Sequence, residues 1–233
     1  MEITIIIISI ITIILLKIGL NVKIKDIKRI KEIGYDKNLN NIANKFPENK
    51  EICIEILEKL NNKDVKIEEN KESKTSLYIA ITNKIIIADI KDTFTRIQTI
   101  AHECLHSVQN RKILLFNFIY SNFYLLYFIV SLVLILFNIG ESLIFVQGFI
   151  FLSIVYLIIR CYLENEAMSK AIFVAKEYMD EQERINENVT KEDVNLLVEK
   201  LDVLNKIGIP LTNFSLLVGC ILKIIILCIG MII

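Results

Sequence analysis

The chain has 233 residues, of which 54% are hydrophobic and 23% are charged, with 27 basic and 27 acidic side chains and no formal net charge. This balance lacks the basic patch expected of a nucleic-acid-binding protein, so no nucleic-acid partner is expected. Glu141 is the only charged residue between positions 113 and 159, which excludes a disordered chain and predicts a membrane protein.

Four apolar runs are candidates for crossing a bilayer, whose hydrocarbon core of about 30 Å takes about 20 helical residues. They are Ile3–Leu16 (reaching Leu20 if Lys17 snorkels), Ile113–Phe137, Leu143–Ile159 and Leu211–Ile233, the last interrupted by Lys223. The first run lacks a basic leader and a small-residue cleavage site, which favours an anchor over a cleaved signal peptide. The sequence therefore predicts about four transmembrane helices.

Basic residues indicate the orientation, because Lys and Arg concentrate in cytoplasmic loops. Nineteen of the 27 lie between Lys17 and Lys112. We therefore expect both termini outside the cell membrane and the long polar stretches in the cytoplasm. The predicted organisation is an anchor at 1–20, a cytoplasmic part at 21–112, two spans at 113–159, cytoplasmic helices at 160–208 and a last span at 209–233.

The first cytoplasmic stretch has the pattern of a helix, a hairpin and a second helix. Apolar residues at helical spacing predict a helix over Asn41–Asn62. Two β-rich runs within Ser76–Ile90 flank Asn83-Lys84 and predict a β-hairpin. Asp92 or Thr93 is then expected to cap a helix that continues through Asn110.

The second cytoplasmic stretch has a helical pattern throughout. Glu164–Asn188 continues the helix of the third span without a break. Thr190 with Asp193 resembles a capping box for a helix over Val194–Ile207, which Gly208 and Pro210 are expected to end. The predicted fold class is a mainly α membrane protein with a small cytoplasmic α+β part.

The chain's two histidines form one motif. His102 and His106 lie four residues apart in IAHECLHSVQ, an H-E-x-x-H pattern on a predicted helix, so both imidazoles leave one helix face. This spacing suits two of the three protein ligands of a catalytic Zn²⁺. Glu103 is then placed to take a proton from an attacking water and pass it to the leaving amine of a peptide bond. A plain pair of surface or core-facing histidines is the alternative, which the neighbouring carboxylate disfavours.

A third zinc ligand has to be Cys, Asp or Glu, because no histidine remains. Two apolar spans separate the H-E-x-x-H motif from an acidic cluster at 162–167, and an even number of spans returns the chain to the same membrane face. Glu164 and Glu166 lie about 200° apart on a helix, so only one of them can face the metal. The spacing alone leaves this choice open.

The motif, the two spans and the pattern E-x-E-A-x-x-x-A together resemble the small bacterial membrane-bound neutral zinc metallopeptidases. The matching residues are His102, Glu103, His106, Gln109, Leu163, Glu164, Glu166, Ala167 and Ala171. A more distant similarity is to the heat-shock and CAAX-prenyl types of membrane zinc protease, whose third ligand is the Glu of E-x-x-A-D. The resemblance implies a gluzincin-like zincin part with Glu164 as third zinc ligand. Zincins also carry an edge strand that pairs with an extended peptide, expected here within Ile79–Asp89.

The expected function is that of a zinc-dependent endopeptidase acting on membrane or membrane-proximal proteins from the cytoplasmic side. Its expected partners are a peptide or protein substrate and the lipid bilayer, and the sequence leaves the oligomeric state open. One alternative is a sensor-protease of the antibiotic-receptor type, which would need an extracellular sensor domain that we do not expect here. Another is a non-catalytic membrane scaffold or regulator with a structural or decayed zinc site. A structural site usually has four ligands rich in Cys, and no such set surrounds residues 102–106.

Overall fold

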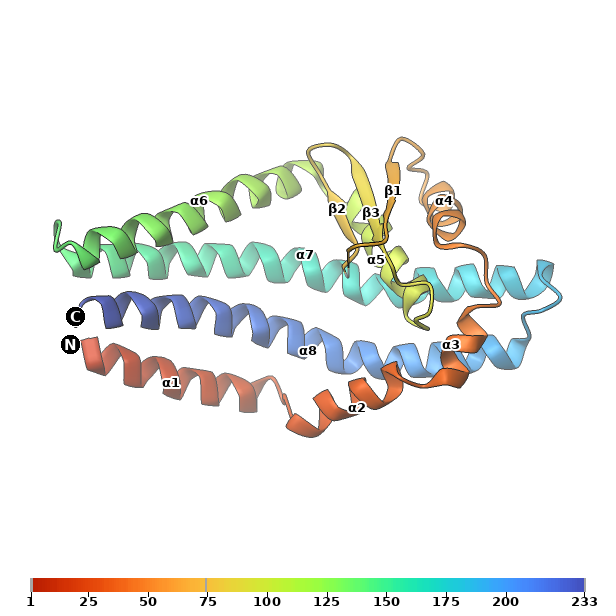
Figure 1. Ribbon diagram of the computed structural model, residues 1–233, viewed down its shortest axis with the longest axis horizontal. Coiled ribbons are helices and arrows are strands. Elements are labelled where there is room, and N and C mark those ends of the chain that lie inside the picture. The colour runs from red at the N-terminus through yellow and green to blue at the C-terminus, as the bar shows by residue number, and fades with distance from the viewer. Residues whose placement is uncertain (1, 74, 233) are drawn as a thin grey trace. The chain divides into compact units, whose positions relative to one another are not determined.

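A computed structural model describes residues 2–73 and 75–232 (Figure 1). The outer ends of the first and last predicted spans, Met1 and Ile233, lie outside the described residues, as does Lys74. The described chain is mainly helical, as predicted. The helices are α1 (Glu2–Gly19), α2 (Ile24–Gly34), α3 (Lys37–Ala43), α4 (Asn49–Lys59), α5 (Arg96–Val108), α6 (Arg111–Leu136), α7 (Ser142–Ile185) and α8 (Lys191–Gly230), and the strands are β1 (Lys66–Asn70), β2 (Leu77–Ile79) and β3 (Lys84–Ala88).

The chain forms two compact units, each built from segments that are distant in sequence. The first unit contains Met1–Lys23, Leu115–Tyr162 and Pro210–Ile233, and the second contains Ile24–Leu114 and Leu163–Ile209. The apolar segments thus gather in one unit and the charged segments in the other. Helices α7 and α8 each contribute one segment to the first unit and another segment to the second.

The first unit is a bundle of apolar helix segments from α1, α6, α7 and α8 (Figure 1). Its core consists of Tyr124, Ile135, Val146, Phe149, Cys220, Leu227 and Cys228. Within residues 2–73 and 75–232, helices α6, α7 and α8 are each long and apolar enough to span a membrane, and the bent pair α1 and α2 counted together would be a fourth candidate. Only 17–22% of the most apolar stretch of these three helices is buried, and so large an exposed apolar surface fits a membrane protein.

Lys223 is the charged exception within the apolar part of α8. Its Nζ donates a hydrogen bond to the Gly219 carbonyl at 3.3 Å and lies 5.5 Å from the ring centroid of Tyr124. A cation is attracted to the face of an aromatic ring, most strongly where water is excluded. Lys223 therefore has both a carbonyl and an aromatic partner inside this unit.

The second unit contains a three-stranded sheet in the order β1-β3-β2. Strands β2 and β3 form the predicted antiparallel hairpin, and Asn83 ends its loop with φ +48°, a left-handed conformation that Asn tolerates. Strand β1 pairs with β3 in parallel and was not predicted, because its sequence KIEEN is polar and mostly exposed.

The central position of β3 corrects the prediction of an edge strand within Ile79–Asp89. Ile85 and Ile87 of β3 are buried in the core, and the strand pairs on both sides. The two edges of the sheet are therefore β1 and the short strand β2. Helix α5 packs against both β2 and β3.

The helix predicted over Asn41–Asn62 is in fact two helices, so that prediction was wrong. Helix α3 ends at Ala43 and α4 begins at Asn49, with Pro47 in the break. A proline disfavours the helical conformation of the residue before it. Glu48 then starts α4 by exchanging capping hydrogen bonds with Glu51.

The helix that carries the two histidines begins later than predicted. It starts at Arg96 with Thr95 in the N-cap position, so neither Asp92 nor Thr93 caps it. The Thr93 hydroxyl instead donates to the Ile90 carbonyl at 2.8 Å in the preceding turn. Arg96 is fully buried, and its guanidinium donates to the carbonyls of Ala43 and Phe46 and to Asn49 Oδ1, each at 2.8 Å. Burial lowers the pKa of Arg96, but an arginine remains a cation at neutral pH. These bonds fix the start of α5 against the break between α3 and α4.

Helix α8 has the predicted capping pair but begins at Lys191, three residues earlier than predicted, and continues much further. The Thr190 N–H donates to Asp193 Oδ2 at 3.0 Å, and the Asp193 N–H donates to Thr190 Oγ1 at 3.2 Å, which confirms the capping pair. The prediction that Gly208 and Pro210 end the helix was wrong, because α8 runs through both. A Cβ at Gly208 would lie 3.3 Å from Met168 Cε, so the glycine leaves room for the end of that side chain of α7.

Replacing the buried arginine is expected to destabilise the second unit. The change Arg96→Met leaves three buried acceptors without a charged donor, so we expect the free energy of unfolding to fall by at least about 3 kcal/mol. Circular dichroism during denaturant unfolding in detergent measures this change. Arg184→Met, at an exposed position of α7, is the matched control and should change stability little. Equal stability of the two variants would contradict this role of Arg96.

Candidate metal centre

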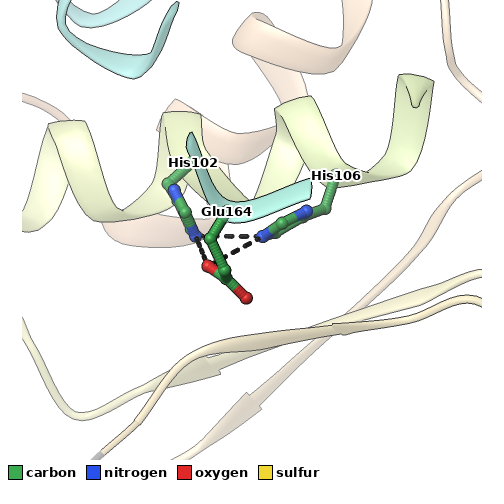
Figure 2. A group of neighbouring side chains, drawn as sticks. All are labelled: His102, His106 and Glu164. Atoms are coloured by element: carbon green, nitrogen blue, oxygen red, sulfur yellow. Dashed lines mark hydrogen bonds and ion pairs between the residues drawn. The ribbon is translucent and has the colours of Figure 1, made fainter. Parts of the chain in front are cut away.

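Three side chains from two helices converge at one point. His102 and His106 leave the same face of α5, and Glu164 reaches them from α7 (Figure 2). The Nε2 atoms of the two histidines lie 3.0 Å apart. Glu164 Oε2 lies 3.5 Å from the Nε2 of His102 and 3.8 Å from that of His106. Among the described residues, this is the one His/Cys/Asp/Glu group of three or more that could hold a metal ion.

These three distances match the requirements of a single tetrahedral cation. Ligand atoms bound to one Zn²⁺ at about 2.1 Å in tetrahedral geometry lie about 3.4 Å from one another. The observed separations of 3.0, 3.5 and 3.8 Å lie on both sides of that value. The three side chains keep 12–20% of their surface accessible, so the site is sheltered but open to solvent.

The carboxylates favour a positive charge at this point. Burial disfavours the protonated form of His106, but its bond to Glu164 and then its bond to Gln109 outweigh burial and raise its pKa. In a bound state, a metal cation would replace the proton as the positive charge beside Glu164. The site is therefore electrostatically suited to a cation.

Glu103 lies beside the cluster on the inner side of α5. It is 7% exposed, and burial raises the pKa of its carboxyl. The neighbouring histidines and a hydrogen bond from the Tyr78 backbone N–H act in the opposite direction. The carboxyl of Glu103 is thus held between the histidine helix and the edge strand β2.

Gln109 joins the two ligand-bearing helices, a role that the sequence reasoning missed. Its Nε2 donates to the Leu163 carbonyl at 2.9 Å and to Glu166 Oε2 at 3.1 Å. Its Oε1 lies 2.8 Å from His106 Nδ1 and can only accept, so that Nδ1 carries the hydrogen. The lone pair of His106 Nε2 then faces the other two ligand atoms. The signal was present in the sequence, since Gln109 lies three residues after His106 and thus close to the same helix face.

The alternative ligand Glu166 lies outside the cluster. Its Oε1 accepts a bond from Lys170 at 2.7 Å, which lowers the pKa of the Glu166 carboxyl, and its Oε2 accepts the bond from Gln109. Of the two glutamates that the spacing left open, the structure brings only Glu164 to the histidines. Ala167 and Ala171 are buried on the same stretch of α7, where small side chains allow the helices to pack closely.

No family model, curated protein or solved structure matches the chain. Two imidazoles with one carboxylate are a ligand set of catalytic zinc sites, whereas structural zinc sites usually have four ligands rich in Cys.

Removing the Gln109 bridge is expected to weaken metal binding without removing a ligand. In Gln109→Ala, His106 loses the partner that fixes its tautomer, and such changes cost roughly 10–100-fold in metal affinity. Competition with a chromophoric zinc chelator measures the affinity. The matched control is Gln98→Ala on the same helix, where the side chain bonds Asn205 instead. An unchanged zinc affinity in Gln109→Ala would show that the bridge does not support the site.

Proposed function

We propose that the protein is a membrane-embedded zinc-dependent endopeptidase that hydrolyses peptide bonds of membrane or membrane-proximal proteins. The observation that carries the proposal is the convergence of His102, His106 and Glu164 beside the buried carboxyl of Glu103. Zn²⁺ bound by the three ligands would act as a Lewis acid and supply an activated water at neutral pH. The resemblance of the motifs to small bacterial membrane-bound neutral zinc metallopeptidases supports the same function.

Glu103 is the proposed general base. It follows His102 directly and cannot share the ligand face of α5, because adjacent helical residues are about 100° apart. Its carboxyl is not one of the three candidate metal ligands, but it lies close enough to His102 and His106 to interact with them electrostatically. In peptide hydrolysis, Glu103 would take the proton of the attacking water and deliver it to the leaving amine.

The proposed path for the substrate backbone is the edge strand β2. The backbone N–H and C=O groups on the outer side of an edge strand can form hydrogen bonds with an extended peptide, which then adds a strand to the sheet. The Tyr78 N–H of this strand already bonds Glu103, so the edge lies next to the proposed base. A peptide paired there would present its backbone to Glu103 and to the ligand cluster.

The membrane context limits the proposed substrates. Three helices long and apolar enough to span a bilayer belong to the same chain as the site, so substrates at or near a membrane are the ones it meets. Lys and Arg concentrate in the charged segments 17–112 and 160–208, with only Lys223 outside them, and this distribution supports a cytoplasmic site in the cell membrane. The open set of three ligands favours catalysis over a purely structural zinc site or a scaffold.

Glu103→Gln separates catalysis from metal binding. The variant keeps the shape of the side chain but loses the base, so we expect zinc content to stay unchanged while hydrolysis falls by roughly 10²–10⁴-fold. Cleavage of a fluorescently labelled unfolded protein by the reconstituted full chain measures the rate. Glu69→Gln, on the exposed face of β1, is the control and should retain full activity. Cleavage that persists in Glu103→Gln or in the presence of a zinc chelator would contradict the proposal.

A further inference from the structure

Helix α2 has an apolar face whose first part, at Ile24 and Ile27, the described protein leaves exposed, while Ile30 is half-buried. Its sequence is IKDIKRIKEIG, in which Ile24, Ile27 and Ile30 recur every three residues and share one face. None of its residues is buried, and Ile24 and Ile27 are 74% and 51% exposed. Contiguous apolar surface of this kind in a charged segment indicates an interaction site.

A C-terminal capping motif ends α1 and separates it from α2. The Val22 N–H bonds the Lys17 carbonyl, the Asn21 N–H bonds the Ile18 carbonyl, and Asn21 has φ +53°. This is the pattern of a Schellman cap with its left-handed residue, which ends a helix and turns the chain. Helix α2 is therefore a separate element and does not continue the apolar helix α1.

The composition of α2 also keeps α2 itself out of the hydrocarbon core. Six of its eleven residues are charged, and such side chains are costly in the hydrocarbon core. The charges are mainly basic, with four basic residues against two acidic ones. They are Lys25, Lys28, Arg29 and Lys31 against Asp26 and Glu32. A short basic helix with one apolar face is the type that lies in the plane of the membrane interface.

We propose that α2 binds the surface of an anionic bilayer. Ile24, Ile27 and Ile30 would enter the boundary between headgroups and acyl chains, and the basic side chains would meet the lipid phosphates. Only four residues, 20–23, separate α2 from the apolar helix α1, so the bilayer surface lies within its reach. At the other end, Ile33 packs against the core of the second unit. This inference does not depend on the proposed peptidase activity.

The absence of tryptophan from the chain makes a direct test available. Ile27→Trp places a single tryptophan on the apolar face, and Arg29→Trp places one about 200° away on the polar face as a matched control. Both positions are exposed, and circular dichroism checks that the fold is retained. The full chain is reconstituted in vesicles of phosphatidylcholine with phosphatidylglycerol, with lipid brominated near the headgroup end of the acyl chain as one quencher and acrylamide in the water as the other.

We expect brominated lipid to quench most of the Ile27→Trp emission and acrylamide to quench most of the Arg29→Trp emission. The charge contribution is tested in the Ile27→Trp background, where Lys25→Glu with Arg29→Glu should reduce quenching by the brominated lipid. The control pair Lys50→Glu with Lys191→Glu, at exposed positions outside α2, should leave it unchanged.

Four results would overturn the inference. Acrylamide quenching of both tryptophans would place α2 in water, and strong quenching of both by the brominated lipid, with neither reached by acrylamide, would make α2 part of a span. Shielding of the Ile27→Trp variant from both quenchers would mean that protein, such as a second copy, covers the apolar face. If the α2 pair (Lys25→Glu with Arg29→Glu) and the control pair (Lys50→Glu with Lys191→Glu) changed quenching by the brominated lipid equally, the basic residues of α2 would have no specific role in binding anionic lipid.

Discussion

The packing of α5 against the adjoining stretch of α7 is the contact on which the metal centre depends. The two histidines come from one helix and the glutamate from another, 58 positions later, so the ligand set exists only while these helices stay in register. Gln109 fixes that register, because one amide bonds a ligand on α5, a carbonyl of α7 and the carboxylate of Glu166. Small buried alanines on α7 permit the close approach. A cation at the centre would in turn offset the cost of holding Glu103 and Glu164 close together in a sheltered site.

Local patterns were sufficient for the parts of the fold that local interactions determine. The H-E-x-x-H spacing placed both imidazoles on one face, the β-rich runs gave the hairpin, and Thr190 with Asp193 gave the start of α8. Strand β1 could not be predicted, because its polar residues become a strand only through pairing with β3. The continuity of α8 through Pro210 was missed for a related reason. Residues of α8 on both sides of Pro210 are buried in hydrophobic cores, Leu197 and Leu201 before it and Leu227 and Cys228 after it, and this packing offsets the one backbone bond that proline removes.

Glu164 and Glu166 could not be distinguished as the third ligand by helix geometry alone. Helical geometry established that only one of them could face the histidines, and the resemblance to known peptidases pointed to Glu164. A further local signal was available, since Lys170 follows Glu166 by four residues and a Glu–Lys pair at this spacing interacts along a helix. Lys170 Nζ lies 2.7 Å from Glu166 Oε1, and this ion pair holds the Glu166 carboxylate away from the metal ligands. The spacing could place Gln109 beside His106, but its bridge to α7 needed the structure, because Leu163 and Glu166 are more than 50 positions away.

The proposed function depends on one metal ion held by His102, His106 and Glu164, and zinc content per chain tests this most directly. The measurement compares wild type, Glu164→Ala and Glu166→Ala after purification in detergent without chelators. The predicted result is about one zinc per chain in wild type and in Glu166→Ala, and much less in Glu164→Ala. Zinc retained in Glu164→Ala, or no zinc in the wild-type protein, would contradict the three-ligand site and with it the proposed peptidase.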